Sequence, residues 1–440
     1  MVQKTRTTDD AGSDAITARW KATPASKEVH FGTIALDEEF RLTFPMLDSP
    51  TDIPSGTTVL WGVTDKLRRC TVLTLPFGPI YGGTSNIVDS ISIDRIFNAS
   101  SAIRHLLIGK KYLDDPTTTF VSQIAFTPRP NKDLCKLPYS TRPEDLFKNL
   151  FELAIKSPAL TVSASIAVQE LCISLNFESP RSLDAALEEA NMLCVFLSFT
   201  AHQYVYPTNF HVWAAGQDSA YEVHCRTFGP PPTRDNTWVG YTLTLPDEQP
   251  TYSHTLQRWY ATNGNYLRGR FLYRYSLKEP NVFSPERFLS VFKALEGAVD
   301  KSGYHLLTAD ELNLAKATLR QCLSTSPRLE DFIGKLNNSE SPAYILKREL
   351  PKILDSANLI PGFDVAEFID RIYSRRNKAS HGGRHLDSSF DSLLVPDTVL
   401  LTAIYLAAEC CQLGLNATEA LRKFRGAFSN MPLPLTLRVP

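Results

Sequence analysis

Residues 364–385 read DVAEFIDRIYSRRNKASHGGRH, and this stretch indicates how the C-terminal part of the chain folds. On a helical wheel with about 100° per residue, its apolar side chains gather on one face, as in a helix that packs against others. They are Val365, Phe368, Ile369 and Ile372. Gly382 and Gly383 suit the position just past a helix end, because glycine readily adopts the left-handed conformation needed there. The stretch therefore predicts an amphipathic helix that ends near His381.

Arginines interrupt the apolar face of this helix. On the wheel Arg376 falls about 20° from the first apolar position, whereas Arg375 lies at the edge of the face and Arg371 on the opposite side. A guanidinium on a core-facing stripe needs an anion, a carbonyl or water, because burying it unpaired is costly. From Arg371 to Arg384 the chain has four arginines, one lysine and no acidic residue. The segment is therefore a local cationic patch.

Helical periodicity extends over the whole region after Pro280. Ser284, Pro285 and Glu286 form a helix-start signal, with serine as the N-cap and proline at the first helical position. The helical patterns around the opening stretch cover residues 284–303, 309–325, 341–359 and 396–415. We expect an all-α helical bundle at residues 281–430, followed by a C-terminal tail at 431–440.

The region before Pro280 has a different character. Short runs rich in Val, Ile, Thr and Phe, separated by Pro and Gly clusters, predict strands. These runs are residues 30–36, 58–64, 70–75, 90–97 and 120–126, and later 160–178 and 210–244. Helices are expected at 141–155, at 179–203 with Ser182 as N-cap, and in the first and last thirds of 255–277. Residues 1–28 are polar and predict a disordered tail.

The fold class expected from these patterns is α+β with several domains. A β-rich N-terminal region at 29–280, which can divide into two subdomains near 140–160, precedes the helical bundle. The 440 residues contain 46 Lys and Arg against 47 Asp and Glu, so the formal net charge is −1. A site for a polyanion must therefore be a local patch.

Composition also guides the expected location and cofactors. The eight cysteines form no CxxC pair, which is typical of reduced thiols in the cytoplasm and indicates neither disulfides nor a zinc site. We expect no metal and no cofactor. The N-terminus lacks an apolar signal segment, and the most apolar stretch, 399–411, is shorter than the roughly 20 residues of a membrane span. A cytoplasmic protein without membrane association is expected.

The cationic helix suits cleavage of RNA without a metal. His381 can act as general acid or base near neutral pH. Arg376 can hold the non-bridging phosphate oxygens and stabilise the charge of a pentacoordinate intermediate, and Asn377 can fix the loop or contact the phosphate. On the wheel of the earlier helix, Glu296 falls between Leu289 and Phe292 on the core-facing side. Glu296 either orients Arg376 or His381 in a polar pocket, or forms a structural ion pair with Arg376.

Residues 375–382, RRNKASHG, resemble the R-x4–6-H motif of the HEPN superfamily in the RNxxSHG form of its ApeA-like branch. The matching positions are Arg376, Asn377, Ser380, His381 and Gly382, with Tyr373 three residues before the motif. Ala294-Leu295-Glu296 is similar to the ALE element in the first helix of that branch. LQRWY at 256–260 is similar to the end of the N-terminal domain that accompanies it.

The resemblance implies a metal-independent endoribonuclease that acts in bacterial defence against phage by abortive infection. Its catalytic residues would be Arg376, His381, Asn377 and Glu296, and its RNA contacts Arg375, Lys378, Ser380 and Arg384. The partners expected are RNA, a second copy of the chain, and a phage-derived trigger sensed by the N-terminal region. In a homodimer, two copies of the motif could supply both a base and an acid.

Two other functions fit the same residues. The bundle could bind RNA or a partner without cleaving it, and the β-rich region would then recognise that ligand. Alternatively, Glu296 and Arg376 could form a core ion pair in a purely structural scaffold.

Overall fold

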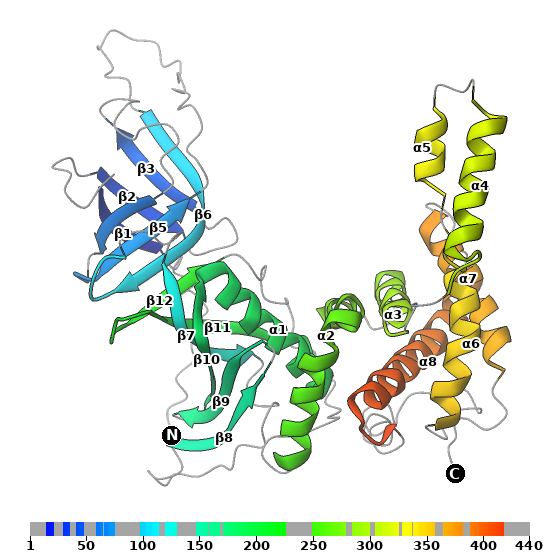
Figure 1. Cartoon of the computed structure of the whole chain (residues 1–440). Helices are drawn as coiled ribbons and strands as arrows, with labels where there is room; N and C mark the ends of the chain where they lie inside the picture. The colour runs from blue at the N-terminus through cyan, green and yellow to red at the C-terminus, as the bar shows by residue number, and fades with distance from the viewer. Residues whose placement is uncertain are drawn as a thin grey trace. The chain divides into compact units, whose positions relative to one another are not determined.

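The computed structural model describes residues 15–21, 30–35, 41–47, 59–64, 66–74, 97–113, 119–129, 147–156, 158–167, 170–225, 249–278, 284–299, 304–324, 328–336, 338–356, 364–381 and 388–417. The chain divides into two compact units. Unit 1 comprises Met1–Cys194 and Val205–Pro231, and unit 2 comprises Val195–Tyr204 and Pro232–Pro440. Figure 1 labels most of the elements of both units.

Strands β1 to β6 of unit 1 form a closed antiparallel ring. They pair in the order β3-β2-β1-β4-β5-β6, and β3 also pairs with β6, which closes the ring. Successive side chains alternate between the two faces of a strand, and Trp20, Leu60, Val72 and Leu106 are buried on the inner face. The strands are β1 (Ala15–Lys21), β2 (His30–Ala35), β3 (Arg41–Leu47), β4 (Val59–Thr64), β5 (Arg69–Thr74) and β6 (Phe97–Gly109).

The same antiparallel sheet continues beyond this barrel in the order β12-β11-β7-β10-β9-β8. The 13-residue strand β6 joins the two parts, because its second half pairs with β5 on one edge and with β12 on the other. The strands are β7 (Phe120–Arg129), β8 (Phe147–Ile155), β9 (Leu160–Ala167), β10 (Glu170–Ser182), β11 (Tyr206–Ala214) and β12 (Ala220–Cys225).

Helix α1 (Leu183–Ala201) follows β10 directly. The Ser182 hydroxyl accepts the amide hydrogen of Ala185 at 3.3 Å, which confirms the predicted N-cap. The imidazole of His105 on β6 lies 2.7 Å from the carboxylate of Asp184. This contact fixes the first turn of α1 to the sheet.

Unit 2 is helical. Helices α2, α3 and α8 pack together, and α6 and α7 pack on each other and lie beside α8 and α3. The helices are α2 (Gln249–Lys278), α3 (Pro285–Gly297), α4 (Ala309–Cys322), α5 (Leu329–Gly334), α6 (Pro342–Ser356), α7 (Val365–His381) and α8 (Ser388–Leu413). Ser284 caps α3 through the amide of Arg287 at 3.1 Å, as its start signal predicted.

The core of unit 2 combines a close helix contact with a buried ion pair. Gly269 of α2 and Gly297 of α3 touch so closely that a Cβ at Gly269 would lie 2.9 Å from backbone atoms of α3. On the same helix, Arg270 donates to Glu409 of α8 at 2.7 Å and to the carbonyl of Trp259 at 2.9 Å. Both charged side chains are almost fully buried. Small residues and a paired charge thus hold α2, α3 and α8 together.

The structure confirms the α+β class and corrects several boundaries. Residues 147–155, expected to be helical, form strand β8, because β9 pairs with this segment along its whole length. Residues 15–21, expected in a disordered tail, form β1. The extended stretch after 160 consists of two strands, β9 and β10. Helix α2 is continuous through the middle third that was not expected to be helical.

The division between the units also differs from the expected domain boundary at 280. It falls near residue 231, because α2 packs with α3 and α8. The strand expected at the end of 210–244 and the predicted tail at 431–440 lie outside the described residues.

Helix α8 corrects the sequence analysis in another respect. Its segment Leu394–Leu413 is long and apolar enough to cross a membrane, although we expected no such segment. However, 78% of the most apolar window of this segment is buried inside the protein. This burial is typical of the core helix of a soluble protein.

Candidate functional site

Helix α7 carries the predicted motif. Arg376 lies five residues before His381, which is the last residue of the helix, in agreement with the expected helix end. Some predicted site groups lie outside the described residues. They are the side chains of Lys378, Ser380 and His381 and the whole of Arg384.

Glu296 is bound by a tyrosine of α7. The Tyr373 hydroxyl donates a hydrogen bond to the Glu296 carboxylate at 2.7 Å. Burial raises the pKa of Tyr373, the hydrogen bond to Glu296 raises it further, and the nearby charge of Arg376 acts in the opposite direction. The ring of Tyr373 also packs edge-on against Phe292, with centroids 4.9 Å apart. The predicted proximity of Glu296 to α7 is therefore present, with Tyr373 as its described hydrogen-bond partner.

Arg376 is half-buried beside this pair. Its Nη1 donates to the Asn377 side-chain oxygen at 3.0 Å, so two residues of the predicted catalytic set are in direct contact. A guanidinium carries five N–H donors in a planar fork. Asn377 can therefore hold Arg376 through one donor while the other donors face a phosphate or carboxylate.

The arginine buried on α7 is Arg375, contrary to the wheel. Arg375 is 8% exposed, whereas Arg376 is half-buried. The Arg375 Nε lies 2.9 Å from a carboxylate oxygen of Asp397 on α8, and Arg371 lies 3.2 Å from the other oxygen. The buried face passes through Phe368, Ile372 and Arg375 because Asp397 offers a buried anion there. To contact RNA as predicted, Arg375 would have to leave this ion pair.

Asp397 is the residue that the sequence analysis missed. It is an acidic residue in the largely apolar helix α8, directly after Pro396, and like Glu409 of the same helix it is buried. An isolated acid on a buried helix usually has a cationic partner, since unpaired burial is costly. This signal could have directed attention to the arginines of α7.

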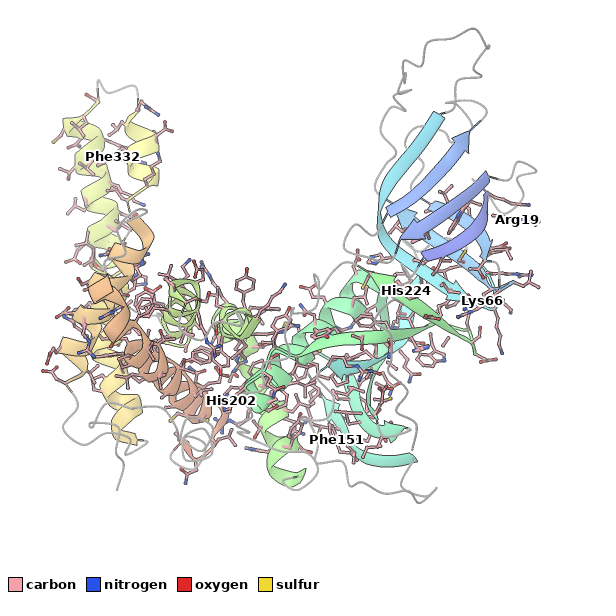
Figure 2. All side chains as sticks on the ribbon, turned by 180° about the vertical axis from the view of Figure 1, so that it is seen from behind. Arg19, Lys66, Phe151, His202, His224 and Phe332 are labelled. Atoms are coloured by element: carbon pink, nitrogen blue, oxygen red, sulfur yellow. The ribbon has the colours of Figure 1, made fainter. Side chains whose placement is uncertain are left out.

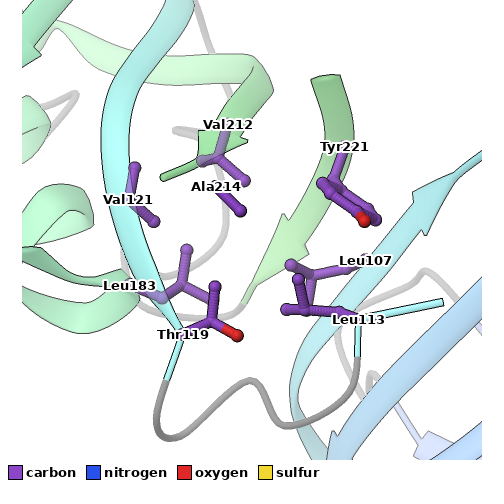
Figure 3. Close-up of a pocket in the computed structure, with 8 residues that line it drawn as sticks. All are labelled: Leu107, Leu113, Thr119, Val121, Leu183, Val212, Ala214 and Tyr221. Atoms are coloured by element: carbon purple, nitrogen blue, oxygen red, sulfur yellow. The ribbon is translucent and has the colours of Figure 1, made fainter. Parts of the chain in front are cut away.

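Two further features of the described residues bear on the binding of metals and small molecules. Within the described ranges, no group of three or more His, Cys, Asp or Glu side chains could hold a metal ion. A pocket in unit 1 is shown in Figure 3. It is lined mainly by apolar side chains, among them Leu107, Val121 and Val212. Its space suits about one water molecule, too little for a substrate.

Comparison with known proteins adds no relative. No family model, no curated protein and no solved structure matches this chain. The geometry around Glu296, Tyr373, Arg376 and Asn377 therefore carries the functional interpretation by itself.

Proposed function

We propose that the protein is a metal-independent endoribonuclease of the HEPN type, in the ApeA-like branch, acting in the bacterial cytoplasm in defence against phage by abortive infection. The observation that supports this proposal is the contact set on α3 and α7. Arg376 is held by Asn377, beside the hydrogen-bonded pair Glu296 and Tyr373, on the helix that ends with His381.

The proposed reaction uses the 2′-hydroxyl of RNA as nucleophile. This oxygen forms a bond to the adjacent phosphorus, and the bond from phosphorus to the 5′-oxygen breaks. The products are a 2′,3′-cyclic phosphate and a 5′-hydroxyl end. One acid–base group removes the proton of the 2′-hydroxyl, and another delivers a proton to the leaving 5′-oxygen.

Each residue of the site has a proposed role in this reaction. His381 transfers a proton, because imidazole titrates near neutral pH. Arg376 binds the non-bridging oxygens and stabilises their developing charge. Asn377 positions Arg376, and Glu296 with Tyr373 holds α3 against α7. In a homodimer, the motifs of two copies could supply the two acid–base groups. Unit 1 would sense a phage-derived trigger.

The test is cleavage of RNA in the presence of EDTA. We expect activity in the wild type and a loss on the order of 10²-fold or more in His381→Ala and in Arg376→Ala, since proton transfer and charge stabilisation each contribute at least that much. Arg328→Ala is a matched control, because this exposed arginine precedes α5 as its N-cap residue, away from the α7 motif in the sequence. Unchanged cleavage by His381→Ala would contradict the proposal. RNA binding without cleavage by the wild type would favour the binding module.

A further inference from the structure

One end of the barrel in unit 1 carries a group of exposed cations, which we call the barrel-end patch. Its members are Lys66, Arg68, Arg69, Lys110 and Lys111, all exposed. Lys66 and Arg68 lie in the turn between β4 and β5, and Arg69 is the first residue of β5. Lys110 and Lys111 directly follow β6. The register pairs Arg69 with Gly109, so the two segments are neighbours. Lys66 is labelled in Figure 2.

Arg68 fixes the turn on the neighbouring strands. Its Nη1 donates to the Glu222 carboxylate of β12 at 2.8 Å, and its Nη2 donates to the Ile108 carbonyl of β6 at 3.3 Å. His224 also lies 3.0 Å from Glu222. The patch is therefore presented by a turn held to two strands, which reduces the entropy lost when a ligand binds.

Arg69, Lys110 and Lys111 can act toward a ligand. Among the described residues, these three take part in no ion pair, and the guanidinium of Arg69 lies 5.2 Å from the ring centre of Tyr112. An arginine stacked on an aromatic ring offers a planar, charged surface on which a nucleobase can stack. Asp65, Asp114 and Asp115 are close to the patch in sequence and lie outside the described residues.

Leu67 at the tip of the turn has an exposed side chain and a backbone conformation that is unfavourable for leucine, so a turn with only a structural role would not favour it. Its side chain is 83% exposed, and its backbone has a φ of 59°, a region that a branched side chain rarely occupies. Glycine or asparagine would form the same turn with less strain. An exposed apolar side chain among cations suits a ligand with both phosphates and apolar flat surfaces.

We propose that the barrel-end patch binds single-stranded nucleic acid. The lysines would contact phosphates, Arg69 would stack on a base, and Leu67 would lie against a neighbouring base. Cations combined with stacking surfaces are the usual means of binding single strands without sequence preference. This site is separate from the one on α7, and the inference does not depend on cleavage.

The experiment measures fluorescence anisotropy of a labelled oligothymidine of about 20 nucleotides with the full chain, at salt concentrations from about 0.05 to 0.2 M. Oligothymidine lacks the 2′-hydroxyl, so failure of the proposed nuclease would leave this binding unchanged. We expect Lys110→Ala/Lys111→Ala to weaken binding on the order of 10-fold. It should also reduce the slope of log affinity against log salt by about 1.4, since each phosphate contact on a single strand contributes about 0.7.

Three further variants separate the contributions of Arg69 stacking, of the Leu67 side chain and of general positive charge to binding. Arg69→Lys keeps the charge but loses the stacking surface, so affinity should fall about 5-fold or more with an unchanged salt slope. Leu67→Asn should weaken binding while the melting temperature stays the same or rises. Arg328→Ala/Lys335→Ala removes two exposed cations of unit 2 and should leave binding unchanged. Equal losses in the two double variants would overturn the proposal. Binding to phosphatidylserine vesicles but not to the oligonucleotide would overturn it too.

Discussion

At the scale of single residues, the carboxylate of Asp397 on α8 binds two arginines of α7, Arg371 and Arg375. The wheel correctly placed Phe368, Ile369 and Ile372 in the core. It exchanged the two arginines, because periodicity averages over a helix and contains no information about the partner helix. Asp397 of α8 decides that Arg375 is buried and Arg376 is not.

We predict that Asp397→Ala destabilises unit 2 by about 3 kcal/mol. The variant leaves Arg375 buried without its carboxylate partner, and breaking a buried pair by removing one member costs that much. Asp331→Ala is the control, because that carboxylate is exposed and 3.9 Å from Arg328. Its effect should stay within about 0.5 kcal/mol. Chemical denaturation measures both; equal stability of the two variants would refute the structural role of Asp397.

We also predict a pH dependence of stability from His202. Burial, together with the smaller effect of the Arg287 charge, lowers the pKa of His202 to about 3. The unfolded chain therefore binds a proton below about pH 6.5 that the folded protein does not bind. His202 therefore lowers the free energy of unfolding as the pH falls from 6.5 toward 3, by up to about 1.4 kcal/mol per pH unit. Above pH 6.5 this loss is absent.

The variant His202→Gln tests the cause of this pH dependence. The His202 ring lies 3.1 Å from the Tyr273 hydroxyl, and a glutamine amide can replace that hydrogen bond without titrating. Denaturation between pH 7 and pH 4 should show a flatter decline in the variant than in the wild type. Parallel curves would show that other groups cause the decline.

At the scale of elements, tertiary pairing explains most of the errors. Residues 141–155 have a proline and acids that favour a helix start, yet residues 147–155 form a strand because they pair with β9. Strand formation depends on the neighbouring strand more than on intrinsic preference. In contrast, α3, α4, α6 and α7 were predictable, because a helix makes its hydrogen bonds locally and its caps are visible in the sequence.

The contact between α2 and α3 gives a matched pair of glycine substitutions on one helix. A Cβ at Gly269 would lie 2.9 Å from the backbone of α3, whereas a Cβ at Gly264 meets nothing within 4 Å. We expect Gly269→Ala to destabilise the protein by about 1 to 3 kcal/mol, since the two helices must separate. Gly264→Ala should stabilise it by up to about 1 kcal/mol, because alanine favours the helix. Thermal melts giving the same sign for both would contradict this packing.

At the scale of the whole molecule, the sequence patterns correctly predicted the α+β class, whereas the two compact units divide at a different residue from the expected boundary at 280. The change from strands to helices is real, but the boundary between units falls before α2, because its packing with α3 and α8 cannot be recognised from composition. The hydrogen bond from Tyr373 to Glu296 joins α7 and α3 across 77 positions of the chain, and the charge of Arg376 acts on the same tyrosine. Only the expected proximity of Glu296 to α7 was accessible from the sequence.

We predict that the protein forms a homodimer with a composite site. Cleavage needs a base at the 2′-hydroxyl and an acid at the leaving oxygen, and one copy of the motif offers one histidine. Light scattering should give a mass near twice 49.2 kDa. Mixing His381→Ala with wild type should lower activity more than dilution alone. A monomer with full activity would exclude the composite site.

The most direct test of the proposed function is the chemistry of the RNA ends. The wild type is incubated with a single-stranded RNA in EDTA, and the products are analysed by mass spectrometry beside those of His381→Ala. We predict 2′,3′-cyclic phosphate and 5′-hydroxyl ends from the wild type and none from the variant. Cleavage that requires a divalent ion, or that leaves a 5′-phosphate, would contradict the proposed mechanism.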